Sequence, residues 1–200
     1  MNLLTQNSKL KKDNIHNFDI PAYKSNTGLI TCPHAKDCIA NCYARQGTYQ
    51  FSNVKAKHEA NLAATFQDDF ADKMITEIKS KRVKILRIHS SGDFYSKNYA
   101  MIWLKIINNC PEVIFYAYTK SWVFFNGINL PNNFKLIQSE GGKMAIDKTK
   151  AHAIVYTKES KIPKGYKNAS DSDLVAVNNK NIFLRYHGNK KANNNGFVHE

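Results

Sequence analysis

Apolar residues recur every four positions between Val54 and Lys81, in the series Leu62, Phe66, Phe70, Met74 and Ile78. This period is typical of a helix with one buried face. Helical spacing returns after Ser96, a residue type that often caps a helix, in the series Tyr99, Ile102, Trp103, Ile106 and Ile107. The sequence therefore predicts one long helix over residues 54–81 and a second that ends at Asn109-Cys110-Pro111.

Short runs of β-branched and aromatic residues lie between and after these helices and predict strands. The two clearest are Val83–His89 and Val113–Tyr118, and four more are expected at residues 135–139, 152–157, 174–177 and 182–187. Strands and helices in this order, with gaps of this length, are typical of parallel βαβ units. We therefore predict one α/β domain over residues 1–200, with an irregular N-terminal segment at 1–25 and a flexible tail at 189–200.

The chain is strongly basic, because it has 29 Lys and Arg against 16 Asp and Glu, a net charge of +13. Such a balance favours polyanionic partners, nucleic acid first and a nucleotide or phosphorylated substrate second. A charge that serves only solubility is the alternative. The sequence contains no run of about 18 apolar residues, so no membrane span is expected. Residues 1–12 lack the features of a signal peptide, which favours a cytoplasmic protein, in the host cell if a phage encodes it.

Three of the four cysteines, Cys32, Cys38 and Cys42, lie within eleven residues, which is typical of metal ligation. A closed zinc site needs a fourth ligand, for which His34 and Cys110 are candidates. A 4Fe-4S cluster takes one thiolate for each iron, so three cysteines would leave one iron open to another ligand. Free buried thiols are the structural alternative. The spacing leaves iron–sulfur and zinc both open.

A second candidate is the stretch Arg87–Phe94, in which a strand ends in Ser90-Ser91-Gly92-Asp93 just before a helix. In α/β folds, ligands bind at such strand ends. Ser91, Gly92 and Asp93 are therefore candidate ligand-binding residues, and Asp93 could accept a hydrogen bond from an amine or a hydroxyl. Helix initiation is the alternative role of Asp93.

Other predicted strands also end in polar residues, which favours Lys120 and Glu140 as residues of the same pocket. His187 is a weaker candidate. Aromatic residues on either side of Lys120 could stack on bases, although at alternate strand positions they more often belong to the core. They are Tyr116, Tyr118, Trp122, Phe124 and Phe125.

Four short motifs resemble an uncharacterised phage and plasmid family known as gene product eighty-eight. They are Thr31-Cys32-Pro33, Asn41-Cys42-Tyr43-Ala44, Ser91-Gly92-Asp93-Phe94 and Tyr118-Thr119-Lys120-Ser121. The likeness covers about residues 20–125 and implies no activity.

The order of the elements also resembles the first half of a radical S-adenosylmethionine enzyme. This resemblance implies that Cys32, Cys38 and Cys42 hold a 4Fe-4S cluster whose open iron chelates the cofactor S-adenosylmethionine. Ser91, Gly92 and Asp93 stand where a Gly-Gly-Glu turn would meet the cofactor amine. The spacing Cys-x5-Cys-x3-Cys is wider than the usual three and two residues. The chain is also shorter than the roughly 250 residues of a full barrel, so the resemblance implies a partial (β/α)6-type barrel with a mostly parallel sheet.

The leading hypothesis is an iron–sulfur enzyme of this type, supplied by an electron donor and acting on a nucleotide or nucleic acid. Lys120 and Glu140 would then face the substrate as catalytic residues. The alternative is a non-catalytic phage or plasmid protein that binds nucleic acid or a host protein, with a structural zinc or a vestigial cluster. A redox or nuclease-like metalloenzyme is a third class, but no carboxylates stand at a diagnostic spacing.

Overall fold

A computed structural model describes residues 2–157, 162–186 and 197–199 of the chain. His187 and residues 189–196 and 200 of the expected tail lie outside the described residues.

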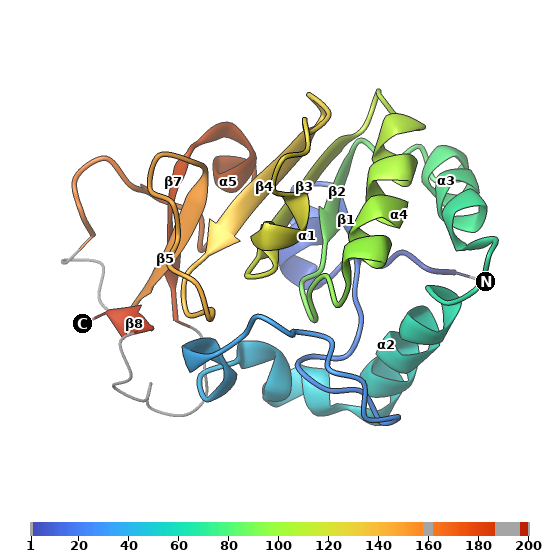
Figure 1. Ribbon diagram of the computed structural model, residues 1–200, viewed down its shortest axis with the longest axis horizontal. Coiled ribbons are helices and arrows are strands. Elements are labelled where there is room, and N and C mark those ends of the chain that lie inside the picture. Colours follow the sequence, from blue (N-terminus) through green and yellow to red (C-terminus); the bar gives the residue numbers. More distant parts are fainter. Residues whose placement is uncertain (1, 158–161, 187–196, 200) are drawn as a thin grey trace.

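The centre of the molecule is a parallel sheet that curls into part of a barrel (Figure 1). Its hydrogen-bonded order is β1-β2-β3-β4-β5-β7-β6, while β8 pairs with β5 off this path. Every strand pairing is parallel, which confirms the predicted fold class. The strands are β1 (Ile15–Phe18), β2 (Ile85–Ile88), β3 (Ile114–Thr119), β4 (Phe134–Ser139), β5 (His152–Tyr156), β6 (Lys167–Asn168), β7 (Asn181–Arg185) and β8 (Val198–His199).

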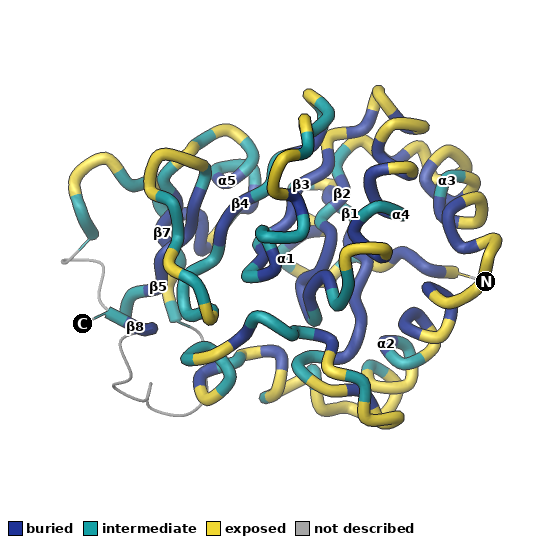
Figure 2. The backbone as a smooth tube through the Cα atoms, in the orientation of Figure 1, coloured by how far each residue is buried: buried dark blue, intermediate teal, exposed yellow. Residues whose placement is uncertain are grey.

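Helices cover both faces of the sheet. The α-helices are α1 (Ser8–Lys12), α2 (Ser52–Ala64), α3 (Phe70–Ser80), α4 (Lys97–Asn108) and α5 (Leu174–Asn178). Short 3-10 helices are η1 (Asp37–Ile39), η2 (Tyr43–Arg45), η3 (Gly47–Gln50) and η4 (Trp122–Phe125). In Figure 2 the strands are largely buried, whereas the outer sides of α2, α3 and α4 are exposed.

The two faces of the sheet bury different cores, because successive side chains of a strand point to opposite faces. On the outer face, Phe18 and Phe115 pack with Met74 of α3 and Trp103 of α4. On the inner face, a smaller cluster joins sheet residues to helices α1 and α5, and its members are Leu10, Ile15, Tyr116, Ile137, Ala153, Ala169, Ala176 and Ile182. Helices α1 and α5 therefore fill the concave side of the curled sheet.

The sheet opens between β4 and β5. These strands pair only through Gln138↔His152 and Ser139↔Ala153. Beyond this point β8 pairs with Val155 and Tyr156 of β5. The C-terminal residues Val198 and His199 are therefore part of the sheet, whereas the sequence predicted a flexible tail.

Three further expectations were wrong. Residues 1–25 contain helix α1 and strand β1, where the sequence predicted an irregular segment. Strand β1, Ile-His-Asn-Phe, is short and half polar, so its residue types alone do not reveal it. The predicted helix 54–81 is two helices, because the Thr65 hydroxyl donates to the Leu62 carbonyl at 2.6 Å and the backbone turns before Phe70. Residues 174–177 form helix α5 and not a strand, with the Ser172 hydroxyl accepting from the Leu174 amide at 3.3 Å.

Candidate functional site

A cavity of about 730 Å³ lies at the carboxyl edge of the sheet. The ends of parallel strands meet at one edge, so residues far apart in sequence line this cavity together. They include Cys32, Cys38, Cys42, the turn Ser90–Asp93, Lys120 and Ser139. In Figure 1 the cysteine segment, in blue, passes along the edge toward which the strand arrows point. The structure therefore brings together the cysteines, Ser91, Gly92, Asp93 and Lys120, all predicted from the sequence.

The cysteine segment is held by the turn that follows β4. The amides of Lys36 and Cys38 donate to the Gly141 carbonyl at 3.2 and 3.1 Å. Gly141 has φ +83°, and a Cβ there would lie 2.2 Å from the ring of Phe197. Glycine is required at this position because the turn must approach both the cysteine segment and Phe197.

Asp93 ties the ends of β2 and β3 together. One carboxylate oxygen accepts from the Phe94 amide at 2.7 Å and from the Thr119 hydroxyl, and the other accepts from the Lys120 amide at 2.9 Å. Burial raises the pKa of Asp93, while these hydrogen bonds lower it in part. Gly92 beside it has φ +84°, and a Cβ would lie 2.3 Å from the Ile20 side chain. Asp93 thus has a structural role whatever else it binds.

Asp19, just after β1, holds the turn from the other side. Its carboxylate accepts from the amides of Ser90 at 2.5 Å and Ser91 at 3.0 Å, and from the side-chain amide of Asn17. His58 Nε2 lies 3.9 Å from the same carboxylate. Asp19 was not among the residues predicted from the sequence, although its position directly after the apolar strand residue Phe18 was a usable signal.

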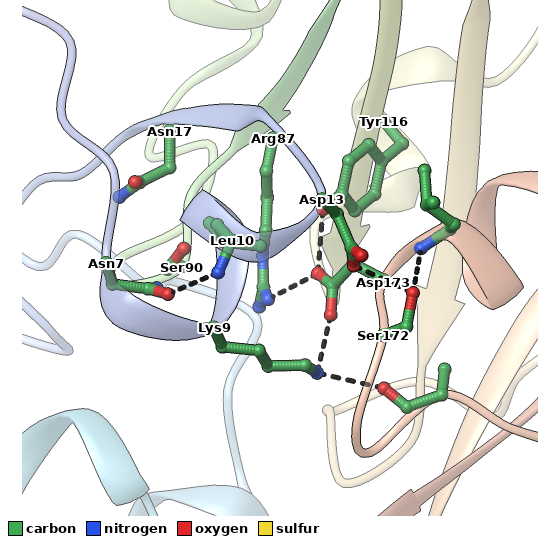
Figure 3. A network of polar contacts seen from close by, with 12 residues as sticks. Asn7, Lys9, Leu10, Asp13, Asn17, Arg87, Ser90, Tyr116, Ser172 and Asp173 are labelled. Atoms are coloured by element: carbon green, nitrogen blue, oxygen red, sulfur yellow. Dashed lines mark hydrogen bonds and ion pairs between the residues drawn. The ribbon is translucent and has the colours of Figure 1, made fainter.

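A buried ion-pair network lies deeper in the concave side of the sheet (Figure 3). Asp173 accepts from Arg87 at 2.8 Å and from the Tyr116 hydroxyl at 2.7 Å, and its other oxygen lies 2.6 Å from Lys9 Nζ. Arg87 also donates to the Tyr43 hydroxyl at 3.2 Å. Tyr43 in turn donates to the Ser90 carbonyl at 2.5 Å. This network joins α1, β2, β3 and the segment before α5, and it was not predicted from the sequence.

Several buried polar atoms around the cavity have no partner in the described part of the chain. They are Asn17 Oδ1, Arg87 Nε, His89 Nδ1, Ser90 Oγ, Ser91 Oγ, Tyr118 Oη and Tyr186 Oη. Most buried polar groups in proteins are hydrogen-bonded. Several buried polar atoms without a partner along one cavity therefore indicate a bound polar ligand or ordered water.

Burial governs the protonation of the site. It raises the pKa of the Cys32 and Cys42 thiols, so both are protonated in the free protein. Burial and the Arg87 charge lower the pKa of His89 to about 3, which keeps its imidazole neutral. His89 Nε2 lies 2.9 Å from the Tyr99 hydroxyl, leaving Nδ1 as the open atom.

Cys42 lies close enough to both Cys32 and Cys38 for their thiolate charges to interact. Sulfurs around one zinc ion lie about 3.8 Å apart. No three His, Cys, Asp or Glu side chains gather closely enough for one ion within the described residues. In a cluster each thiolate binds a different iron, so the sulfurs stand farther apart. All three cysteines line the same cavity.

Neither candidate for a fourth zinc ligand lies with the cysteines. Cys110 is buried in the outer core, after α4 and before β3, and so at the opposite edge of the sheet. His34 Nδ1 lies 3.2 Å from the Ser121 hydroxyl, with its ring packed on Phe124. Both are absent from the residues that line the cavity.

The two predicted catalytic residues are placed differently. Lys120 lines the cavity and donates to the Ser139 hydroxyl at 2.9 Å. Glu140 lies outside the lining, and its carboxylate is 2.8 Å from His199 Nε2. Of the aromatic residues around Lys120, Tyr118 lines the cavity, while Tyr116 and Phe125 belong to the cores.

The model of the family described as "Gene product 88" matches residues 1–200. The chain belongs to this family. The Gene 88 proteins of Mycobacterium phages L5 and D29 are both 30% identical to it, over 46% of this chain and 43% of each relative. The match thus spans less than half of the length of these relatives. No solved structure matches the chain. The family resemblance read from the motifs is confirmed.

None of the helices in the described part of the chain is long and apolar enough to cross a membrane.

Proposed function

We infer that this member of the Gene product 88 family is an iron–sulfur protein of the radical S-adenosylmethionine type that acts on a nucleotide or nucleic acid. The observation that carries this proposal is the shared cavity. Cys32, Cys38 and Cys42 lie on it together with the turn Ser91-Gly92-Asp93, although the two segments are about fifty residues apart.

The cysteines are the proposed ligands of a 4Fe-4S cluster. The cysteine segment follows β1 and the Ser91–Asp93 turn follows β2, and these strands are parallel neighbours. Ser91 and Asp93 therefore reach the space beside the cysteines from the adjacent strand end. Asp93 is close enough to Cys32 to influence its pKa, as is Lys120.

When bound, the reduced cluster would supply one electron to S-adenosylmethionine and thereby generate a radical that abstracts hydrogen from the substrate. The chain's own residues would bind and orient the cofactor and the substrate. The open hydroxyl of Ser91 can accept from the cofactor amine, and the Asp93 carboxylate already adjoins that space. Lys120 would face the substrate. Glu140 is not part of the proposal, because its carboxylate engages His199.

Anaerobic purification and reconstitution with iron and sulfide test the proposal. We expect a brown protein with a broad visible band and S-adenosylmethionine binding, by calorimetry, only after cluster loading. Replacing Cys32, Cys38 or Cys42 by Ala should abolish cluster retention, whereas Cys110→Ala, the matched control at the opposite edge, should retain it.

Two results contradict the proposal. A colourless protein that contains stoichiometric zinc would favour a structural metal in a non-catalytic binding protein. A fully loaded protein that binds no S-adenosylmethionine would leave the cysteines without the proposed catalytic role.

A further inference from the structure

The cavity has a second polar region, centred on Arg87, which contacts Asp173 and Tyr43. Asn17, Arg87 and Tyr116 stand in register on β1, β2 and β3, so they form one layer across the concave face. This layer lies below the strand ends that carry the turn Ser90–Asp93.

Arg87 is held in place but not fully used. Its Nη1 donates to Asp173 at 2.8 Å and its Nη2 donates to the Tyr43 hydroxyl at 3.2 Å. The guanidinium also lies over the Tyr118 ring, 5.0 Å from its centroid. Arg87 Nε is buried and has no partner in the described residues. The fixed guanidinium therefore presents one donor nitrogen without a partner in the described residues.

Two further polar groups without a partner in the described residues line the same cavity. The hydroxyls of Tyr118 and Ser90 are buried, line the cavity and have no partner among the described residues. The Arg87 guanidinium lies over the Tyr118 ring, and Tyr43 links Arg87 to the Ser90 carbonyl. Arg87 Nε can only donate and both hydroxyls can donate, so a group with several acceptor oxygens would satisfy all three.

The net charge of the side chains that line the cavity also favours an anion. Five Lys and Arg side chains line the cavity against three Asp side chains. Asp19 and Asp93 each accept from backbone amides of the chain, and Asp173 is shared by Arg87, Lys9 and Tyr116. With two cations on one carboxylate, the network retains one positive charge.

We propose that Arg87, with the hydroxyls of Tyr118 and Ser90, forms a subsite for an anionic group with terminal oxygens, a phosphate or a carboxylate, carried by a small-molecule substrate. This subsite gives the substrate class for the function proposed above and rests on that function for the reaction, although anion binding itself needs no cluster. A 5′-nucleotide would meet the requirement through its phosphate.

The test is calorimetric titration of the 200-residue chain, without cluster, with inorganic phosphate and separately with acetate at constant ionic strength. We expect saturable binding of one anion; preference for phosphate assigns a phosphate ester, and preference for acetate assigns a carboxylate. Arg87→Gln should weaken binding by about tenfold or more, because it removes a charge-assisted donor. Tyr118→Phe removes one hydroxyl and should weaken binding by roughly three- to tenfold.

Lys84→Gln is the matched control, because it removes the same charge from an exposed residue just before β2, at the edge away from the cavity. Its affinity should equal that of the unmodified protein. The proposal is overturned if neither anion binds saturably, or if Lys84→Gln loses as much affinity as Arg87→Gln. If Arg87→Gln does not fold, Tyr118→Phe decides, and unchanged anion affinity in that variant also overturns the subsite. Because no readout involves the cluster or S-adenosylmethionine, failure here and failure of the proposed reaction are distinguishable.

Discussion

Arg87 and Asp173 lie 86 residues apart in sequence, yet the guanidinium of one donates to the carboxylate of the other at 2.8 Å. The pair connects strand β2 to the segment before α5. Lys9 of α1 also forms an ion pair with the Asp173 carboxylate. Helices α1 and α5 fill the concave face of the sheet and form what we call the floor of the cavity. The Asp173 carboxylate helps to hold this floor together.

Asp173→Asn should destabilise the protein by about 3–5 kcal/mol, because it leaves two cations near the floor without their counter-ion. The control Asp171→Asn changes the same charge at an exposed position nearby and should shift stability by less than about 0.5 kcal/mol. Urea unfolding measures both. Equal effects in the two variants would contradict a special role for Asp173.

The same pair predicts a pH dependence. Burial alone would raise the pKa of Asp173, but Arg87 and Lys9 outweigh it and hold the pKa below its usual range. A carboxyl with a lowered folded-state pKa contributes stability above its unfolded pKa of about 4 and loses it as pH falls through the folded value. The stability gap between the unmodified protein and Asp173→Asn should stay constant from about pH 7 to pH 5 and shrink below about pH 4. A gap that closed near neutral pH would point to another group.

Ser91 and Asp93 should respond differently to replacement. Asp93 accepts from the Lys120 amide and the Thr119 hydroxyl, so Asp93→Ala should cost about 1–3 kcal/mol of stability as well as weaken S-adenosylmethionine binding. The Ser91 hydroxyl has no partner in the described residues, so Ser91→Ala should weaken cofactor binding and leave thermal stability nearly unchanged. Calorimetry on the cluster-loaded variants, beside thermal unfolding, separates the two. Unchanged cofactor affinity in both would remove this turn from the cofactor site.

Gly141 and Gly127 form a matched pair of substitutions. Both have positive φ, +83° and +75°, but a Cβ at Gly141 would meet the Phe197 ring while one at Gly127 has nothing within 4 Å. Gly127→Ala should cost about 1–2 kcal/mol for the left-handed conformation alone. Gly141→Ala should cost roughly 1–3 kcal/mol more, since Phe197 and the cysteine segment must shift. Urea unfolding tests this difference, and equal losses would show that Phe197 does not pack on the turn.

Nucleic-acid binding should depend steeply on salt if the net charge of +13 serves that purpose. Each neutralised phosphate contributes about −0.9 to the slope of log K against log salt on duplex DNA, and about −0.7 on single strands. Titrations with duplex DNA, single-stranded RNA and heparin would measure the slopes. Weak retention on all three polyanions, without preference, would support only a solubility charge.

The sequence by itself determined the parallel α/β class, the position of the strands that lead to the site, and the cysteine and Ser-Gly-Asp segments. These are local properties, since they depend on apolar periodicity and on residue types at the ends of apolar runs. What the tertiary structure decided depends on contacts between distant segments. Residues 174–177 favour a strand by composition, yet they form a helix beside a carboxylate bound by Arg87 and Lys9. Lys120 and Glu140 are similar as polar residues after strands, and only the folded chain places the first on the cavity and the second against His199. Asp19 binds the amide of Ser90, 71 residues away, and Asp173 pairs with Lys9, 164 residues away, and no periodicity in a single chain can show such pairings.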